Sequence, residues 1–116
     1  GALPTAGCDA ACAVNAEADG FVGDFPELVR QGHYESLDVA ADEPLRPSAG
    51  APWTFGRHLT MNARRRGRAL ESHYWLYAMP GFFLKLRSSF PASPQARAEL
   101  QRFVDELPGA MVAPRP

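Results

Sequence analysis

The fold is decided by the stretch Leu70-Glu-Ser-His-Tyr-Trp-Leu-Tyr-Ala-Met79, Pro80-Gly81, Phe82-Phe-Leu-Lys-Leu-Arg-Ser-Ser-Phe90. Its first and last parts are rich in aromatic and apolar residues, which is typical of strands on a pleated, half-buried surface. Between them, the proline presets φ at the first turn position and the glycine accepts a positive φ at the second. The stretch therefore predicts a β-hairpin.

A two-residue turn would fix the register of this hairpin. The opposite pairs would be Met79–Phe82, Tyr77–Leu84, Trp75–Leu86 and His73–Ser88. We expect this face to form the core. The other face would be partly wet and would carry Tyr74, Leu76, Lys85 and Arg87. A slip of one residue would exchange the faces, and a four-residue turn is the open alternative because Pro-Gly type II turns splay strands.

The segment after the hairpin predicts an amphipathic helix. Ser93 is a suitable N-cap, and Pro94 at the first helical position loses no N–H that the helix needs. Apolar residues then recur at helical spacing: Ala96, Leu100, Phe103, Val104 and Leu107. Pro108-Gly109 predicts the end of the helix. We expect the core to be built by Trp75, Tyr77, Phe82, Leu84, Leu100 and Phe103.

Weaker signals predict the rest of the fold. They indicate a helix over 10–18 capped by Asp9 and ended by Asp19-Gly20, then a short helix from Asp24 to Gly32, a strand over 34–40, a loop over 41–52, a strand over 53–62 and a turn over 63–67. Together the segments predict an α+β domain. Its antiparallel sheet would have about four strands, with the meander 53–90 covered by the C-terminal helix.

Composition limits the class of protein. The chain has 116 residues and a net charge of −1, which fits one domain and argues against disorder and against a nucleic-acid partner. Alanine, arginine, proline and glycine are abundant and lysine is scarce, a usage associated with GC-rich bacteria. We expect residues 9–116 to form a single domain and residues 1–8 to be a leader remnant or anchor segment.

Three alternatives are open for Cys8 and Cys12. Leu3-Pro-Thr-Ala-Gly-Cys8 resembles the end of a bacterial lipoprotein signal, which would anchor the chain to a membrane through Cys8. A disulfide is the second, although cysteines one helical turn apart would need local unwinding. The third is a copper or zinc site completed by a histidine.

The remaining candidates are single residues and one charge run. His73 would share the core face with Trp75, where a hydrogen-bonded core histidine is the simpler interpretation, and His58 could approach it if their strands pair in a suitable register. Trp53 would start a strand beside the 41–52 loop, as a core residue or as part of a binding site. The run at 64–68 holds four arginines. It could contact phosphate, an anionic membrane surface or an acidic partner, but a solvated hairpin tip is the simpler interpretation.

One resemblance adds to this interpretation. Gly81-Phe-Phe-Leu-Lys-Leu-Arg-Ser-Ser-Phe-Pro91, followed by a helix with Phe103-Val-Asp-Glu-Leu107, resembles the C-terminal end of uncharacterised exported bacterial proteins and is loosely similar to Mog1/PsbP-like envelope domains. The resemblance implies a sheet-and-helix fold and an envelope setting. It assigns no functional residue.

We therefore expect a non-catalytic module of the bacterial cell envelope, periplasmic or membrane-anchored, that binds a protein or a small ligand without a cofactor. No phosphate loop, metalloprotease motif or nucleophile elbow stands in the sequence. The interface candidates are Trp53, His73, Tyr74, Lys85 and Arg87. The alternatives are a copper or zinc carrier that uses Cys8, Cys12 and a histidine, and a small enzyme centred on His73 with the 41–52 loop as its lid.

Overall fold

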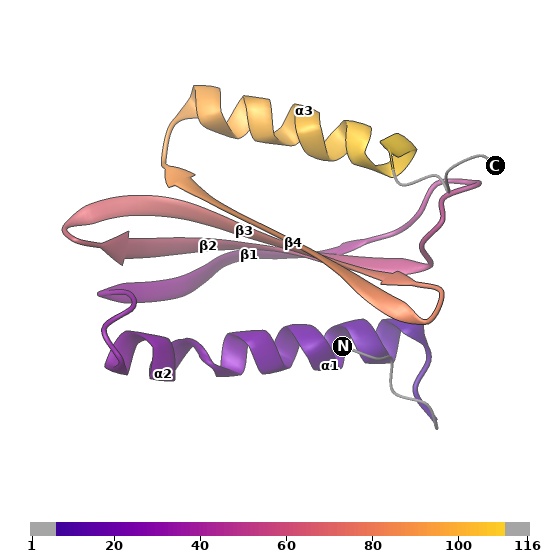
Figure 1. The fold of residues 1–116 in the computed structure, drawn as a ribbon, viewed down its shortest axis with the longest axis horizontal. Helices are drawn as coiled ribbons and strands as arrows, with labels where there is room; N and C mark the ends of the chain where they lie inside the picture. The colour runs from indigo at the N-terminus through magenta and orange to yellow at the C-terminus, as the bar shows by residue number, and fades with distance from the viewer. Residues whose placement is uncertain (1–6, 111–116) are drawn as a thin grey trace.

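The computed structural model describes residues 7–110 as three helices and one sheet (Figure 1). The elements in chain order are α1 Ala10–Gly23, α2 Phe25–Arg30, β1 Ser36–Leu45, β2 Phe55–Arg65, β3 Arg68–Met79, β4 Phe82–Pro91 and α3 Pro94–Ala110. The strands form an antiparallel meander in the order β1-β2-β3-β4. The predicted α+β class is confirmed.

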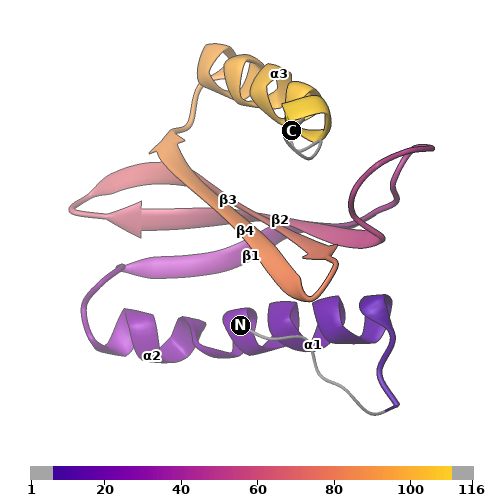
Figure 2. The same cartoon turned by 45° about the vertical axis from the view of Figure 1, so that its right-hand side comes forward.

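The sheet is the middle of three layers. Figures 1 and 2 show α1 and α2 along one face of the sheet and α3 on the opposite face. The face with Tyr74 and Leu76, which we expected to be partly wet, is covered by a helix of its own. Apolar residues of α1 pack on this face and bury Tyr74 and Leu76, whereas the sequence had suggested that one helix covered the other face alone.

The predicted register of the β3–β4 hairpin is confirmed. Met79 lies opposite Phe82, and the pairing continues regularly to Leu70 opposite Pro91. Gly81 has a φ of 79°, the positive value that the second position of the turn requires. The four-residue alternative is thereby excluded.

The connection between β2 and β3 is shorter than the predicted turn over 63–67. Only Arg66 and Gly67 separate the two strands, with φ values of 53° and 75°. Two positive φ angles are what a tight hairpin turn of type I′ needs, because its twist matches that of the strands. The flanking arginines therefore belong to the strands.

Strand β1 runs through the first part of the predicted 41–52 loop, to Leu45. A register shift between Val39 and Ala41 marks a bulge, and Pro44 is tolerated because β1 is an edge strand. Three prolines, with Gly50 and Ser48, were the reason for predicting a loop over 41–52. On an edge strand, Pro44 removes only a donor that would face away from the sheet.

Helix α1 passes the predicted end at Asp19-Gly20 and reaches Gly23. A glycine inside a helix costs about 1 kcal/mol relative to alanine, but Ala18 before it is fully buried and Phe21 after it packs on the core. The predicted cap is confirmed, since the Cys12 backbone N–H donates to Asp9 Oδ1 at 2.9 Å. Asp24 precedes α2 as predicted but makes no capping hydrogen bond with its side chain.

The core has a part on each face of the sheet. On the α1 face it contains Val14, Ala18, Leu59, Tyr74 and Leu76, among others; on the α3 face Trp53, Trp75 and Tyr77 pack together. The two parts alternate along β3, where Tyr74 and Leu76 face α1 while Trp75 and Tyr77 face α3.

The α3 helix is less embedded than predicted. Its cap is confirmed, because the Ala96 N–H donates to Ser93 Oγ at 3.1 Å, and Leu100 packs against the core. Phe103 is 57% exposed and Phe82 is 49% exposed, so these two core predictions are wrong. Phe82 begins an edge strand, and Phe103 belongs to an exposed run, 101–103, that follows Leu100. The side chains of Val104 and Leu107 lie outside the description, and the helix ends at Ala110 and not before Pro108.

None of the helices in the described part of the chain combines the length and apolarity that crossing a membrane requires.

Candidate functional site

A groove of about 740 Å³ lies between α1 and strands β3 and β4. We name it the α1–β4 groove. Its lining residues are Ala16, Glu17, Gly20, Phe21, Asp24, Tyr74, Lys85 and Arg87. Three of the interface candidates from the sequence, Tyr74, Lys85 and Arg87, thus come together in one groove.

Two periodicities bring these residues together. Tyr74 lies opposite Arg87 in the β3–β4 register, and Lys85 is two residues from Arg87, so all three share one face of the sheet. Glu17 and Phe21 are one helical turn apart and face the sheet from α1. The groove is the space between these α1 side chains and the β3–β4 side of the sheet.

The two cations of the groove differ in their partners. Lys85 Nζ donates to Glu17, and this hydrogen bond is the main cause that raises the pKa of Lys85. The Arg87 guanidinium lies 5.1 Å from the centre of the Phe21 ring and makes no ion pair within the described residues. Arg87 therefore keeps a charge available to an anionic ligand.

The floor of the groove is aromatic. The rings of Phe21 and Tyr74 lie with their centres 4.1 Å apart. Burial raises the pKa of Tyr74, so its hydroxyl stays protonated at neutral pH and can donate a hydrogen bond. The groove can hold an apolar or aromatic group beside a negative charge.

On the opposite face, four polar side chains form a hydrogen-bonded chain that we name the histidine chain: Arg97, Glu71, His73 and His58. Arg97 Nη2 donates to Glu71 Oε1 at 2.6 Å, and Glu71 Oε2 lies 2.7 Å from His73 Nε2. His73 Nδ1 lies 2.7 Å from His58 Nε2. The β2–β3 register places His58 opposite Trp75, diagonal to His73, so the approach of the two imidazoles follows from strand pairing.

The protonation states of the histidine chain follow from its partners. Hydrogen bonding from Arg97 is the main cause that lowers the pKa of Glu71; burial opposes it and His73 adds to it. A carboxylate only accepts, so His73 donates through Nε2, and a neutral His73 then accepts from His58 through Nδ1. Burial, followed by repulsion from His73, lowers the pKa of His58 against the opposing effect of Glu43 and Glu71.

His73 is a buried, fully engaged residue. It is 7% exposed, both of its ring nitrogens have partners, and its ring stacks on Trp75 at 5.2 Å and on Phe90 at 5.6 Å. His73 is thus the hydrogen-bonded core histidine that was the simpler interpretation of the sequence. His58 is the more accessible of the two histidines, half-buried on the Trp75 ring with ring centres 4.8 Å apart.

Trp53 is also a core residue. It is 6% exposed and packs edge-on against Tyr77, with ring centres 4.9 Å apart. Its indole N–H has no hydrogen-bond partner among the described residues. Trp53 closes the aromatic cluster and does not lie at an exposed loop edge.

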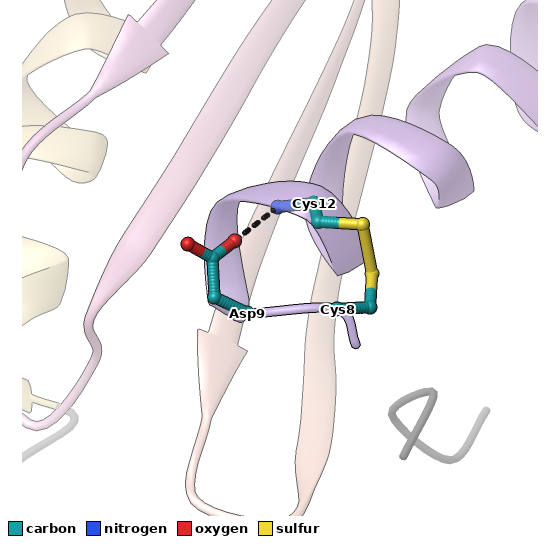
Figure 3. Close-up of a disulfide and its surroundings, with 3 residues drawn as sticks. All are labelled: Cys8, Asp9 and Cys12. Atoms are coloured by element: carbon teal, nitrogen blue, oxygen red, sulfur yellow. Dashed lines mark hydrogen bonds between the residues drawn. A yellow bond between two sulfur atoms is a disulfide. The ribbon is translucent and has the colours of Figure 1, made fainter. Parts of the chain in front are cut away.

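Cys8 and Cys12 form a disulfide, with Cα atoms 5.2 Å apart (Figure 3). Cys8 precedes the N-cap Asp9, so it lies outside the regular helix, which is the local departure that this pairing needs. A sulfur in this bond is not available as a thiolate or for a thioether. Cys8 also packs on the α1-face core, away from the histidine chain. The described side chains include no group of three His, Cys, Asp or Glu residues placed to hold a metal.

Sequence reasoning missed the residues that complete both sites. Glu71 and Arg97 are 26 positions apart, and Phe21 reaches the groove only because α1 extends beyond Gly20. A weak signal was present for Glu71. It is two residues from His73 on a strand, so the two side chains share a face.

Comparison of the chain with protein families, curated proteins and solved structures finds no match. The functional argument therefore depends on the chemistry of the site.

Proposed function

We propose that this chain is a non-catalytic binding module of the bacterial cell envelope and that the α1–β4 groove holds its ligand. The observation that carries the proposal is the convergence of Tyr74, Lys85 and Arg87 with Phe21 in one groove. These residues supply an aromatic surface, a hydrogen-bond donor and a cation with no carboxylate partner. Binding sites commonly combine an apolar surface with a few polar groups that orient the ligand.

The chemistry of the groove favours a ligand with an apolar body and an anionic group. Arg87 is the anchor for the anion, because guanidinium presents a planar fork of donors that matches acidic oxygens. Phe21 and Tyr74 would contact the apolar body. The ligand is either a small molecule or a side chain presented by a protein.

The disulfide supports the envelope part of the proposal. Disulfides persist in oxidising compartments, such as the bacterial periplasm, and are rare in the cytosol. A periplasmic form keeps the Cys8–Cys12 bond, whereas a form anchored through Cys8 has to leave that sulfur free for the lipid. The intact mass of protein isolated from its host distinguishes them, since a disulfide removes two hydrogens and a lipid adds its whole mass.

The two alternatives have less support. A copper or zinc carrier would need Cys8 and Cys12 reduced and a histidine beside them, but both sulfurs are bonded to each other. An enzyme centred on His73 would need that imidazole to reach a substrate, and it is buried between Trp75 and Phe90.

The proposal is tested by NMR titration with two probes of similar shape and opposite charge, phenylacetate and phenethylamine. We expect phenylacetate to shift the backbone amides of residues 17–24, 74 and 85–87, and phenethylamine to leave them unchanged. Arg87→Gln should weaken phenylacetate binding about tenfold, because hydrogen bonds to charged groups contribute roughly 1.5–3 kcal/mol.

The matched control is Arg102→Gln, which removes the same charge from the exposed surface of α3 on the other side of the sheet. It should bind phenylacetate like the parent protein. Equal shifts from both probes, or equal losses in the two variants, would refute the proposed site.

A further inference from the structure

A smaller cavity, of about 210 Å³, adjoins the α1–β4 groove at Arg87. We name it the arginine cavity. Its lining residues are Leu28, His33, Tyr34, Arg65 and Arg87. Two guanidinium-bearing side chains thus face one small space, and none of the lining residues carries a carboxylate.

The fold brings these residues together from four elements. Arg65 is the last residue of β2, and strand alternation places it on the same face as Met61, towards the helices. Arg87 reaches that face from β4, two strands away. His33 and Tyr34 belong to the link between α2 and β1, which Gly32, with a φ of 83°, turns towards the sheet end.

The two arginines of the cavity differ from others in the protein. Arg57 pairs with aspartates and Arg97 with Glu71. Among the side chains that the structure describes, neither Arg65 nor Arg87 makes an ion pair. Two like charges that share a cavity repel each other, and an anion between them would convert that repulsion into attraction.

The surroundings strengthen the positive potential. Arg66 lines a neighbouring groove of about 290 Å³ with Arg65, and Arg68 lines another of about 540 Å³ with both. The acid among the lining residues of these grooves is Glu35, whose Oε1 already accepts from the Gly67 N–H at 2.6 Å. Clefts lined by one sign of charge concentrate counter-ions.

We propose that the arginine cavity binds a phosphate group, with Arg65 and Arg87 as the charged donors and Tyr34 and His33 as further hydrogen-bond donors. A carboxylate has two oxygens and is satisfied by a single guanidinium fork. Two guanidiniums, a hydroxyl and an imidazole offer donors from several directions, which suits the three or four oxygens of a tetrahedral oxyanion.

The inference extends the proposed function and rests on it in one respect: Arg87 lines both spaces, so a single ligand would place its apolar body in the groove and its phosphate in the cavity. Two sources have this chemistry, a soluble phosphate ester and the headgroup of an anionic lipid. Inorganic phosphate alone tests the cavity without the groove.

The first experiment is an NMR titration with sodium phosphate at constant pH and ionic strength, with sodium chloride as the reference. We expect saturable shifts at the amides of His33, Tyr34, Arg65 and Arg87. Arg65→Gln, which leaves the lining of the α1–β4 groove intact, should weaken phosphate binding about tenfold and leave phenylacetate binding unchanged.

The matched control is Arg46→Gln, which removes the same charge from an exposed residue just after β1. It should bind phosphate like the parent protein. Unsaturable shifts, or equal weakening in the two variants, would show only a general effect of charge and would overturn the inference. If phenylacetate fails to bind while phosphate binds at Arg65, the groove proposal falls and the cavity stands.

The second experiment separates the two sources. Glycerol phosphate is titrated in solution, and co-flotation is measured with vesicles of phosphatidylcholine alone and with vesicles that also contain phosphatidylglycerol. Binding of glycerol phosphate without flotation identifies a soluble ester. Flotation with phosphatidylglycerol that is lost in Arg65→Gln and kept in Arg46→Gln identifies the headgroup. Failure of both, or flotation equal in the two variants, contradicts the proposed site.

Discussion

The two faces of the sheet are built from alternate residues of the same strands, yet different interactions hold them to their helices. On the α1 face, apolar side chains such as Val14, Leu59 and Leu76 form a continuous core. On the α3 face, buried Glu71 ties the helix to the sheet through Arg97 and continues into His73. Apolar packing is more extensive on the first face, where the ion pairs Arg57–Asp19 and Lys85–Glu17 add to it. The second face holds the buried Glu71 and His73 beside its aromatic cluster. Truncation should therefore damage the first face most, whereas the titration of Glu71 and His58 should act on the second.

The largest effect should follow Leu59→Ala, which deletes a fully buried side chain on the α1 face. We expect the free energy of unfolding to fall by about 2–5 kcal/mol, the usual range for a leucine truncation that leaves a cavity. Urea denaturation measures it. Leu86→Ala, at a half-buried position on the α3 face, is the matched control and should cost less; the reverse order would contradict the comparison.

A smaller loss should follow Glu71→Gln. The change removes the carboxylate that accepts from both Arg97 and His73, so a buried imidazole N–H loses a charged acceptor. We expect about 1–3 kcal/mol, the cost of leaving such a group poorly satisfied. Urea denaturation gives the loss, and hydrogen exchange should show faster opening in α3 than in α1.

Glu99→Gln, at an exposed position of α3, is the control for this change. It removes one carboxylate from α3, the helix that Glu71 holds through Arg97, and should leave the free energy of unfolding nearly unchanged. Similar losses in the two variants would mean that Glu71 acts only through the net charge of the protein and not through its contacts with Arg97 and His73.

The double substitution Cys8→Ser and Cys12→Ser should have a more local effect. The disulfide joins Cys8, just before the N-cap, to Cys12 in the first turn of α1, and the chain-entropy model gives roughly 2 kcal/mol or less for so small a ring. Hydrogen exchange should speed up in the first turn of α1 and stay unchanged in α3. Faster exchange throughout α3 would show that the two faces are coupled.

The smallest effect should be the pH dependence that His58 and Glu71 give to the α3 face. The folded-state pKa values of both His58 and Glu71 are lowered. For a lowered pKa, the stability is present above the unfolded value and is lost as the pH falls through the folded value. Protonation of His58 should therefore lower the free energy of unfolding as the pH falls below 6.5, the ordinary pKa of a histidine. Protonation of Glu71 should lower it further as the pH falls below 4.5, the ordinary pKa of a glutamate.

The urea midpoint measured against pH separates the two windows. His58→Phe keeps a ring on Trp75 but removes the titration, so the loss that begins near pH 6.5 should disappear while the loss below 4.5 remains. Glu71→Gln should do the opposite. An unchanged profile in His58→Phe would rule out this histidine as the cause.

The sequence predicted best where a local signal sets the geometry. Pro80-Gly81 fixed the β3–β4 register through one turn, and Ser93 marked the start of α3 through one hydrogen bond. These features depend on neighbouring residues alone. The hairpin register in turn placed Tyr74, Lys85 and Arg87 on one face before their partners were known.

Predictions failed where tertiary burial overrides a local preference. Gly20 should end a helix, but the burial of Ala18 and the packing of Phe21 carry α1 past it. Alternation also could not tell which face of the hairpin would be covered, because both faces carry aromatic residues. The Arg97–Glu71 pair depends on where α3 lies over the sheet, which no periodicity reveals.

The two edges of the sheet have an unequal capacity for association. Strand β1 has a bulge near Ala40 and a proline at Pro44, both of which hinder pairing with another chain. Strand β4 pairs regularly with β3 from Phe82 to Pro91 and leaves its outer side without a neighbouring strand in the described structure. Two copies joined edge to edge along β4 would form a closed twofold dimer with only β1 edges outside, so self-association of this sheet would end at two molecules and not extend into a fibre.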